Sequence, residues 1–293
     1  MSSPGADQDD ARQRGVEAAF QAALNSHGYG LQFAVLKAAK DAYNKGISRW
    51  ELQVSEMPVA VQQQETRVDF ILCQVHHTTY LLLAECKRAN PKFVDWCFCR
   101  SPFVRRNDTG EALLLEHVAL DSTNGVYTKL RPIYAGTRNS YHIAIEVKGR
   151  AKGDAQPPSA SRGAIEEAAG QCMMSLNGMI EGCRGHPQRL KANGEITFLP
   201  VIFTTARLWV SDIDLGQANL ATGELSEQAA LKQVDWLYYQ YHVSPGLKHQ
   251  APPGEGRETT LPQILRAEYI RSIVVVSALA TAKFLQAANP ETW

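Results

Sequence analysis

The sequence predicts an α/β protein in which helices flank a mixed β-sheet, and three segments carry this prediction. Residues 12–45 place apolar side chains at helical spacing, residues 67–89 form two apolar arms around a short polar turn, and residues 165–180 return to helical spacing. Apolar, strand-like segments follow at 196–201 and 270–276. Because helices and strands alternate along the chain, a sheet covered by helices is the expected class.

Length and composition are those of an ordinary globular protein. The 293 residues are 44% apolar and 20% charged, which suits one large domain. We expect a disordered tail over residues 1–10 and a single domain over 11–293, with an insertion at 90–160. Lys plus Arg and Asp plus Glu number thirty each, so any binding to nucleic acid must rely on a local basic patch.

The sequence predicts no contact with a membrane. The first ten residues, MSSPGADQDD, lack the basic start and apolar run of a secretory signal. The longest apolar stretch, near 273–280, is too short to cross a bilayer. We therefore expect a cytoplasmic protein whose six cysteines are reduced.

The chain begins with helices and then a strand. Two apolar stripes lie within residues 12–45, and Gly28 and Gly30 interrupt them, so two successive helices are expected. Residues 50–61 then alternate apolar and polar side chains, as in a strand that continues past Pro58.

The pattern of residues 67–89 is typical of a β-hairpin. Antiparallel pairing about His77 places Asp69 opposite Glu85, because positions equidistant from the turn face each other. Lys87 lies two residues beyond Glu85 and so points to the same side of the sheet. Both faces are otherwise apolar, with Ile71, Cys73, Leu81 and Leu83 on the side of the charged residues and Val68, Phe70, Leu72, Tyr80, Leu82 and Ala84 on the other.

The insertion is expected to extend the sheet or cover the site. It contains a predicted hairpin at 112–134 around the turn Asn124-Gly125 and a strand at 141–148. A flexible linker at 151–163 leads to the helix at 165–180. The remaining expected elements are strands at 196–201, 207–213 and 270–276, an aromatic edge strand at 234–243, a loop at 244–260 and a helix at 280–288.

The presence of three charged residues on an otherwise apolar hairpin needs a chemical explanation. Burying unpaired charge is costly, so clustered acids in a dry sheet normally pair with a cation or bind a metal. The two carboxylates of Asp69 and Glu85 offer the hard oxygen ligands that Mg²⁺ prefers, and the Lys87 ammonium suits chemistry on phosphate. The competing interpretation is a structural ion pair, which needs only one acid.

An Asp followed sixteen positions later by Glu-x-Lys, on an apolar hairpin preceded by a helix, resembles the active site of the PD-(D/E)XK nuclease superfamily. The resemblance implies a restriction-endonuclease-like αβββαβ core and hydrolysis of phosphodiester bonds with Mg²⁺ or Mn²⁺. It favours DNA over RNA and an endonuclease over an exonuclease, in a setting such as bacterial defence or DNA processing. The insertion stands where this family has its crossover helix, which is a departure from the pattern.

The resemblance also assigns roles to individual residues. Asp69, Glu85 and the main-chain carbonyl of Cys86 would hold the metal, and Lys87 would orient or deprotonate the attacking water. Some members of the family carry a glutamate on the first helix and a glutamine on a later one. The candidates here are Glu17 and Gln171, whose plain interpretations are an exposed helix carboxylate and a polar residue at the rim of an apolar helix.

A second Glu-x-Lys, Glu146-Val147-Lys148, competes for the catalytic role. Its strand alternates regularly, with His142, Ala144, Glu146 and Lys148 on one side. Such a strand is typical of a sheet with one solvent-exposed face, so its charges need no special purpose.

Basic residues are frequent in the middle of the chain, with aromatic residues between them. Those expected to contact nucleic acid are Arg88, Arg105, Arg106, Lys148 and Arg150. Arginine binds phosphate through forked donors, and Trp96, Phe98 and Phe103 are candidates for stacking on bases. A solvated surface with a few structural arginines is the alternative.

Two other functions fit the same residues. A non-catalytic module of the same fold could bind nucleic acid or a partner protein, and a metal-dependent hydrolase could act on small phosphorylated molecules. Cleavage of both DNA strands would favour a homodimer. The sequence leaves open the oligomeric state and whether an activating ligand or partner exists.

Overall fold

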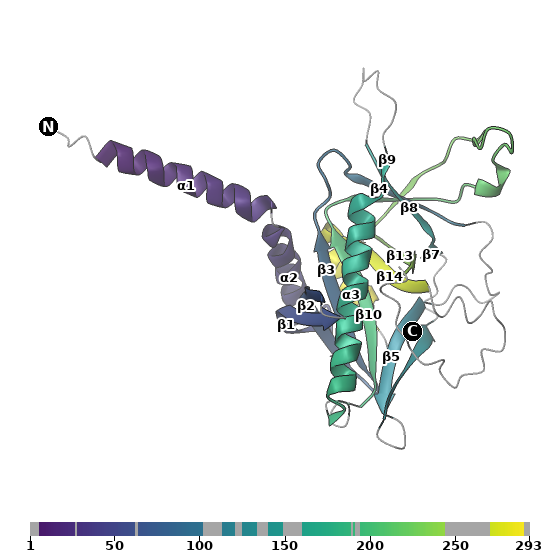
Figure 1. Ribbon diagram of the computed structural model, residues 1–293, viewed down its shortest axis with the longest axis horizontal. Helices are drawn as coiled ribbons and strands as arrows, with labels where there is room; N and C mark the ends of the chain where they lie inside the picture. Colours follow the sequence, from purple (N-terminus) through teal and green to yellow (C-terminus); the bar gives the residue numbers. More distant parts are fainter. Residues whose placement is uncertain are drawn as a thin grey trace.

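The computed structural model is a mixed α/β protein with two β-sheets and packed helices (Figure 1). It describes residues 6–26, 28–61, 64–101, 113–120, 125–133, 140–148, 160–188, 190, 194–243 and 270–289. Within these residues there are four α-helices, and none of them combines the length and the apolar character that crossing a membrane requires.

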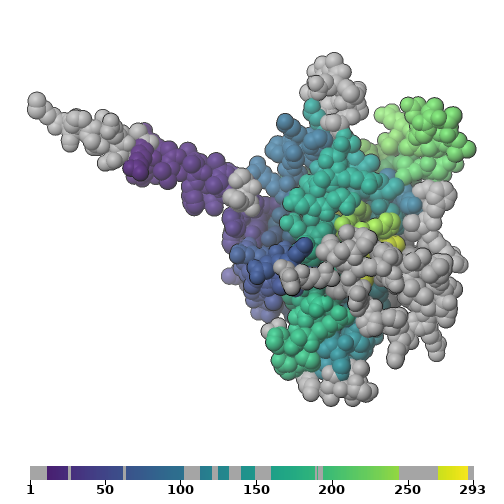
Figure 2. Space-filling view, viewed as in Figure 1, coloured from purple at the N-terminus to yellow at the C-terminus, as the bar shows by residue number. Residues whose placement is uncertain are grey.

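The two N-terminal helices differ in how they contact the rest of the protein. Helix α1 (Ala6–Ser26) projects from the body, while α2 (Tyr29–Asn44) packs against it (Figures 1 and 2). Gly28 lies between them with a φ of 78°, a conformation that glycine adopts without strain. The predicted break near Gly28 is therefore confirmed, and residues 6–10, which we assigned to a tail, lie in α1.

The larger sheet has nine strands in the described part of the chain. Seven of them follow the order β1 (Glu51–Val61), β2 (Gln64–Val75), β3 (Thr79–Lys87), β10 (Ile196–Thr204), β14 (Ile270–Ser277), β13 (Trp236–His242) and β7 (Ser140–Tyr141). The other two form a hairpin, β5 (Leu113–Leu120) with β6 (Val126–Ile133), which joins the sheet through β10. The three central strands β3, β10 and β14 are parallel, so the sheet is mixed.

The smaller sheet has five strands from distant parts of the sequence. Their order is β12 (Lys232–Val234), β11 (Arg207–Ser211), β4 (Asp95–Cys99), β8 (Ile143–Val147) and β9 (Ala160–Ser161). A short 3₁₀ helix, η1 (Leu215–Gln217), lies between β11 and β12. The insertion therefore adds β5, β6 and β7 to the larger sheet and supplies β4 and β8, with the start of β9, to the smaller one.

Helices cover both faces of the larger sheet. Helix α3 (Gly163–Gly185) lies on one face, where buried side chains such as Ile165 and Met173 pack against Ile71 and Leu83. On the other face lie α2 and the C-terminal pair η3 (Ala278–Ala280) and α6 (Thr281–Ala287). The two apolar faces predicted for the hairpin thus enter two separate cores.

Helix α3 approaches the sheet closely at one point. A Cβ atom added to Gly178 would lie 2.6 Å from the Cβ of Val59 on β1, which is too short for two carbon atoms. Glycine at this position therefore sets how near the helix can come to β1, and with it the position of α3 over β2 and β3.

The strand expected at 207–213 is β11, which belongs to the smaller sheet, where it pairs with β4 and β12. One expected position differs in the structure. The aromatic strand β13 was expected at an edge, but it lies between β14 and the two-residue β7. Its side chains from Leu237 to Tyr241 are buried, because large aromatic residues gain most when both faces are covered.

Candidate metal and phosphate site

The register predicted for the central hairpin is confirmed. Strands β2 and β3 pair from Val75 with Thr79 to Phe70 with Ala84, around a turn at residues 76–78. This is the register that brings Asp69 to the level of Glu85. Whether these residues form an active site is a separate question, which depends on their surroundings.

The two strands separate immediately after the last of these pairs. Strand β3 continues beside β10 as far as Lys87 and Thr204. Asp69 instead directs its carboxylate to β3, and its Oδ2 accepts a hydrogen bond from the main-chain N–H of Cys86 at 2.6 Å. Asp69 and Glu85 therefore lie close together where β2 and β3 separate.

Both carboxylates are held in surroundings that disfavour their charge. Burial, and to a lesser extent the negative charge of Asp69, raise the pKa of Glu85 to about 8. Burial also raises the pKa of Asp69 to about 6, against the hydrogen bonds from Cys86. Glu85 is only 8% exposed, so its charge gains little from water. The pair needs a positive partner in order to be fully ionised.

Lys87 supplies positive charge on the same side of β3, but its closest partner lies on α3. Its Nζ atom is 2.7 Å from Oε1 of Glu167, and only 19% of the Lys87 side chain is exposed. The charge of Lys87 lowers the pKa of both Asp69 and Glu85. Glu167 was not among the site residues expected from the sequence, although its position four residues before Gln171 places the two on one helix face.

Gln171 lies one turn further along α3 than Glu167. Its Oε1 atom is buried and has no hydrogen-bond partner among the residues that the structure describes. A buried carbonyl oxygen without a partner is costly and indicates a missing donor, such as a water molecule or a ligand group. Burial and the nearby charges of Glu85 and Asp69 raise the pKa of the next residue, Cys172, so this turn of α3 faces the carboxylates.

A second group of polar residues supports Asp69 from the side of α2. The buried Gln32 donates through Nε2 to Oε1 of Glu56 and, at 3.1 Å, to the main-chain oxygen of Asp69. Glu56 has a φ of 54°, in the left-handed region that disfavours residues with a Cβ. It stands between the ladder pairs of β1 and β2 that involve Phe70 and Val68.

The distortion at Glu56 also explains one exception to the predicted faces. Val68 was expected on the same face as Phe70, but it belongs to the core on the α3 side. The alternation of the strand is interrupted at Asp69, which lies between them. An irregular strand at this point re-aims the Asp69 side chain toward β3.

Glu17 is not brought to this site. It lies on α1, which projects away from the sheet (Figure 1), and its Oε1 accepts a hydrogen bond from Gln13 one turn earlier. Its side chain is exposed. Helix α2 does supply a polar residue near Asp69, namely Gln32. Gln32 lies on the buried face of α2 together with Val35, Leu36 and Ala39, and the apolar pattern of the sequence did not single it out.

The donors at the site fit a weakly held divalent cation. Among the described residues, no group of three or more His, Cys, Asp or Glu side chains is arranged to hold a metal. Asp69 and Glu85 provide two carboxylates. The N–H of Cys86 points toward Asp69, and its carbonyl points to the same side, since both groups of one strand residue face the same neighbour. Mg²⁺ commonly uses one or two carboxylates and completes its shell with water and substrate phosphate.

The alternative pair Glu146 and Lys148 has another role. Glu146 is almost fully buried, and its Oε1 accepts hydrogen bonds from the N–H groups of Ala164 and Ile165, at 2.6 and 3.2 Å. It therefore caps the first turn of α3. The expectation that this side of β8 is exposed is wrong, because Ala144 and Glu146 are its buried residues. The strand lies in the smaller sheet and not beside Asp69.

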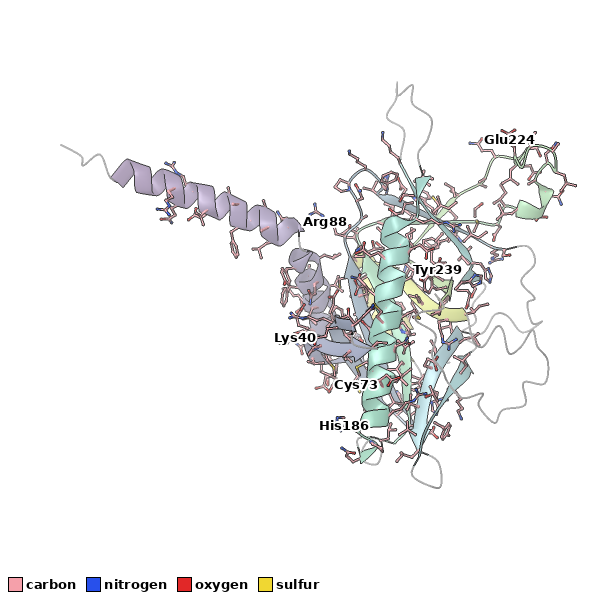
Figure 3. All side chains as sticks on the ribbon, in the orientation of Figure 1. Lys40, Cys73, Arg88, His186, Glu224 and Tyr239 are labelled. Atoms are coloured by element: carbon pink, nitrogen blue, oxygen red, sulfur yellow. The ribbon has the colours of Figure 1, made fainter. Side chains whose placement is uncertain are left out.

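The basic residues expected to contact nucleic acid are only partly described. Arg88 is exposed next to Lys87, near the junction of α1 and α2 (Figure 3), and its Nη1 donates to the Asn25 carbonyl at 2.7 Å. Lys148 is half-buried just after β8. Arg105, Arg106 and Arg150 lie outside the described residues, as does Phe103.

The aromatic residues of β4 are not available for stacking on bases. Trp96 and Phe98 are buried in the core on the α3 side. They alternate with half-buried cysteines along a strand that is paired on both sides. Sequence reasoning could not distinguish these core aromatics from an exposed platform.

One further arginine lies at the end of the parallel strands. The turn after β10 is tied to the chain after β3 by two hydrogen bonds, from the Ala89 N–H to Thr205 Oγ1 and from the Arg207 N–H to the Val94 carbonyl, at 2.9 and 2.8 Å. Arg207 pairs with Asp95 at 2.6 Å, and 55% of its side chain is exposed. Arg88 and Arg207 thus lie at the carboxyl ends of β3 and β10.

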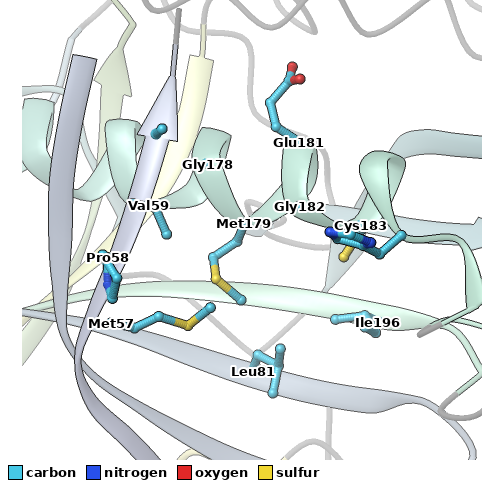
Figure 4. A pocket seen from close by; sticks show the side chains of 12 residues that line it. Met57, Pro58, Val59, Leu81, Gly178, Met179, Glu181, Gly182, Cys183 and Ile196 are labelled. Carbon is cyan, nitrogen blue, oxygen red and sulfur yellow. The ribbon is translucent and has the colours of Figure 1, made fainter. Parts of the chain in front are cut away.

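A separate cavity of about 480 Å³ lies at the other end of α3 (Figure 4). Its lining is mainly apolar, and Met57, Leu81, Met179 and Ile196 point into it. None of the candidate site residues lines it. This cavity is therefore distinct from the group formed by Asp69, Glu85 and Lys87.

No family model, curated protein or solved structure matches the chain. The functional interpretation therefore depends on the geometry described above and on the resemblance of the Asp and Glu-x-Lys pattern.

Proposed function

We propose that the chain is a Mg²⁺- or Mn²⁺-dependent phosphodiesterase that cleaves DNA, with an endonuclease favoured over an exonuclease. The observation that carries this proposal is the meeting of two carboxylates of raised pKa, Asp69 and Glu85, with Lys87 at the point where β2 and β3 separate. A structural ion pair would need one acid, whereas here Lys87 already pairs with Glu167, and Asp69 and Glu85 remain as two further acids beside it. A divalent cation would neutralise their charge.

The order of elements supports a restriction-endonuclease-like core. Leaving the insertion aside, the chain runs α2, β1, β2, β3, α3 and β10, which corresponds to the αβββαβ order that the resemblance implies. Strand β10 returns parallel to β3, after a connection that includes α3. In sheets with parallel strands, ligands commonly bind at the carboxyl ends of the strands, and Glu85 and Lys87 lie near that end of β3.

Each residue then has a chemical role. Asp69 and Glu85, with the Cys86 carbonyl, would hold the cation, whose chemistry when bound is to neutralise phosphate charge and to acidify a bound water. Lys87 donates hydrogen bonds to the attacking water or to the oxygens on which charge develops. Gln171 accepts a hydrogen bond from that water through its unpartnered Oε1. Arg88 and Arg207 bind the phosphate backbone at the strand ends.

A cleavage assay tests the proposal. Plasmid, linear duplex, single-stranded DNA and RNA are incubated with the protein and either Mg²⁺ or EDTA. We expect cleavage of DNA with Mg²⁺ only, and a loss of at least about 10²-fold in Asp69→Asn, Glu85→Gln and Lys87→Met, since each removes a charge that acts in the transition state. Glu51→Gln and Lys40→Met, at exposed positions on β1 and α2, are the matched controls.

Two outcomes would contradict the proposal. Cleavage that persists in EDTA, or at wild-type rates in the three site variants, would show that another protein region or a contaminant acts. Binding of DNA without cleavage would favour the non-catalytic module instead. Cleavage of small phosphorylated compounds but not of DNA would favour the small-molecule hydrolase.

A further inference from the structure

We infer that Glu167 is a positioning residue that holds the Lys87 ammonium away from Asp69 and Glu85, and so keeps these two carboxylates free to bind a divalent cation. This inference rests on the proposed function and adds to it a residue that the sequence pattern does not contain. It explains why the Lys87 ammonium group does not occupy the place of the cation between the two carboxylates.

The risk of self-blocking follows from the strand geometry. Glu85 and Lys87 lie two residues apart on one face of β3, so their Cα atoms are about 7 Å apart. The four-carbon stem of lysine is long and flexible enough to bring its ammonium group back between the two carboxylates. An ammonium group there would neutralise the pair and compete directly with a cation for the same oxygen atoms.

In the structure the ammonium group forms its ion pair with Glu167, beside the two carboxylates, whose pKa values its charge lowers. Lys87 Nζ lies 2.7 Å from Glu167 Oε1, and the Glu167 side chain is 57% exposed. A carboxylate that remains in contact with water keeps its charge at little cost, whereas Glu85 is buried. Glu167 therefore offers Lys87 a better partner than the buried pair does.

The fold fixes Glu167 in this position. Glu146 accepts hydrogen bonds from the N–H groups of Ala164 and Ile165, and Ile165 is completely buried. The first turn of α3 is thereby held in place, and Glu167 follows it directly. The carboxylate that holds Lys87 is placed by a rigid element and not by a loop.

Cation binding in the absence of substrate tests the inference. Mg²⁺ and Mn²⁺ are titrated by calorimetry at pH 8 into the wild-type full chain, Glu167→Gln, and the double variant Glu167→Gln with Lys87→Met. We expect Glu167→Gln to weaken cation affinity on the order of tenfold. The double variant should regain at least wild-type affinity, because no ammonium group is left to compete.

The matched control is Glu181→Gln, an exposed carboxylate on the same helix that pairs with Arg184. It should bind cations as the wild type does, and circular dichroism melts should show that all variants are folded. Wild-type affinity in Glu167→Gln, or no recovery in the double variant, would overturn the inference alone. A wild-type protein that binds neither cation would overturn the proposed function together with it.

Discussion

Glu85 retains its proton over a pH range in which an exposed glutamate is ionised, because burial and Asp69 raise its pKa to about 8. In the unfolded chain Glu85 loses this proton near the ordinary glutamate pKa of 4.5. Between these two values the native state binds one proton more than the unfolded state. The free energy of unfolding therefore falls as pH rises through this window, by about 1.4 kcal/mol per unit for one such group.

The fall in stability with rising pH gives a prediction for Glu85→Gln. The amide has no proton to lose, so the variant should lack most of the decrease in stability between pH 5 and pH 8. We expect its Tm at pH 8 to exceed that of the wild type by several degrees, with a much smaller difference at pH 5. Thermal melts in EDTA across this range make the measurement, with Glu51→Gln as the exposed control. Parallel profiles for wild type and Glu85→Gln would refute the assignment of the raised pKa.

Ionisation of Asp69 also lowers the free energy of unfolding, over a lower pH range. Its pKa is raised to about 6, so it adds to the fall in stability between about pH 4 and pH 6. Two acids that lose stability on ionisation are a poor choice for a purely structural role. Their presence at one point of the sheet is what the proposed cation site would require.

At the scale of single elements, α3 depends on the carboxylate of Glu146. This buried group accepts two main-chain hydrogen bonds at the positive end of the helix. We expect Glu146→Ala to lower the free energy of unfolding by about 1–3 kcal/mol, because two buried N–H groups lose their acceptor. Denaturant unfolding measures the change, and Glu181→Ala on the exposed part of the same helix should leave stability nearly unchanged. An equally stable Glu146→Ala would show that the cap contributes nothing.

The elements also show what the sequence alone could predict. The hairpin of β2 and β3 was predictable in register and in faces because its information is local: a turn, two apolar arms and a period of two. The pairing of β3 with β10 joins segments more than a hundred residues apart, and no local pattern encodes it. Glu167 depends on that pairing and on the placement of α3, so its contact with Lys87 was not foreseen.

The strand β8 illustrates the opposite failure. Its alternation of polar and apolar residues was read correctly, but the polar side faces the core because α3 needs an acceptor there. A polar residue on a strand indicates a solvent-exposed face only when no helix end lies nearby to use its side chain as an acceptor. Trp96 and Phe98 were misjudged for a related reason, since their strand β4 lies in the smaller sheet and their side chains pack into the core, where Phe98 contacts Tyr239 of the larger sheet.

At the scale of the whole molecule, α1 stands apart from the packed body (Figure 2). Val16 and Phe20 are 62% and 64% exposed, and the main contacts of α1 are with α2. Helix α2, in contrast, buries Val35, Leu36 and Ala39 in the core beneath the sheet. The described structure thus divides into a core that begins with α2 and an arm that precedes it.

This division predicts the effect of truncation. A chain that begins at residue 27 should keep a Tm within about 2 °C of the full chain, because few apolar contacts are lost. A chain that begins at residue 45 should not fold, because the core facing α2 would lose a set of buried side chains. Circular dichroism melts of both chains make the comparison, and sedimentation at matched concentrations reports any change in oligomeric state. A large fall in Tm on removal of α1 alone, especially with the loss of a dimer, would mean that its exposed apolar residues are covered in solution.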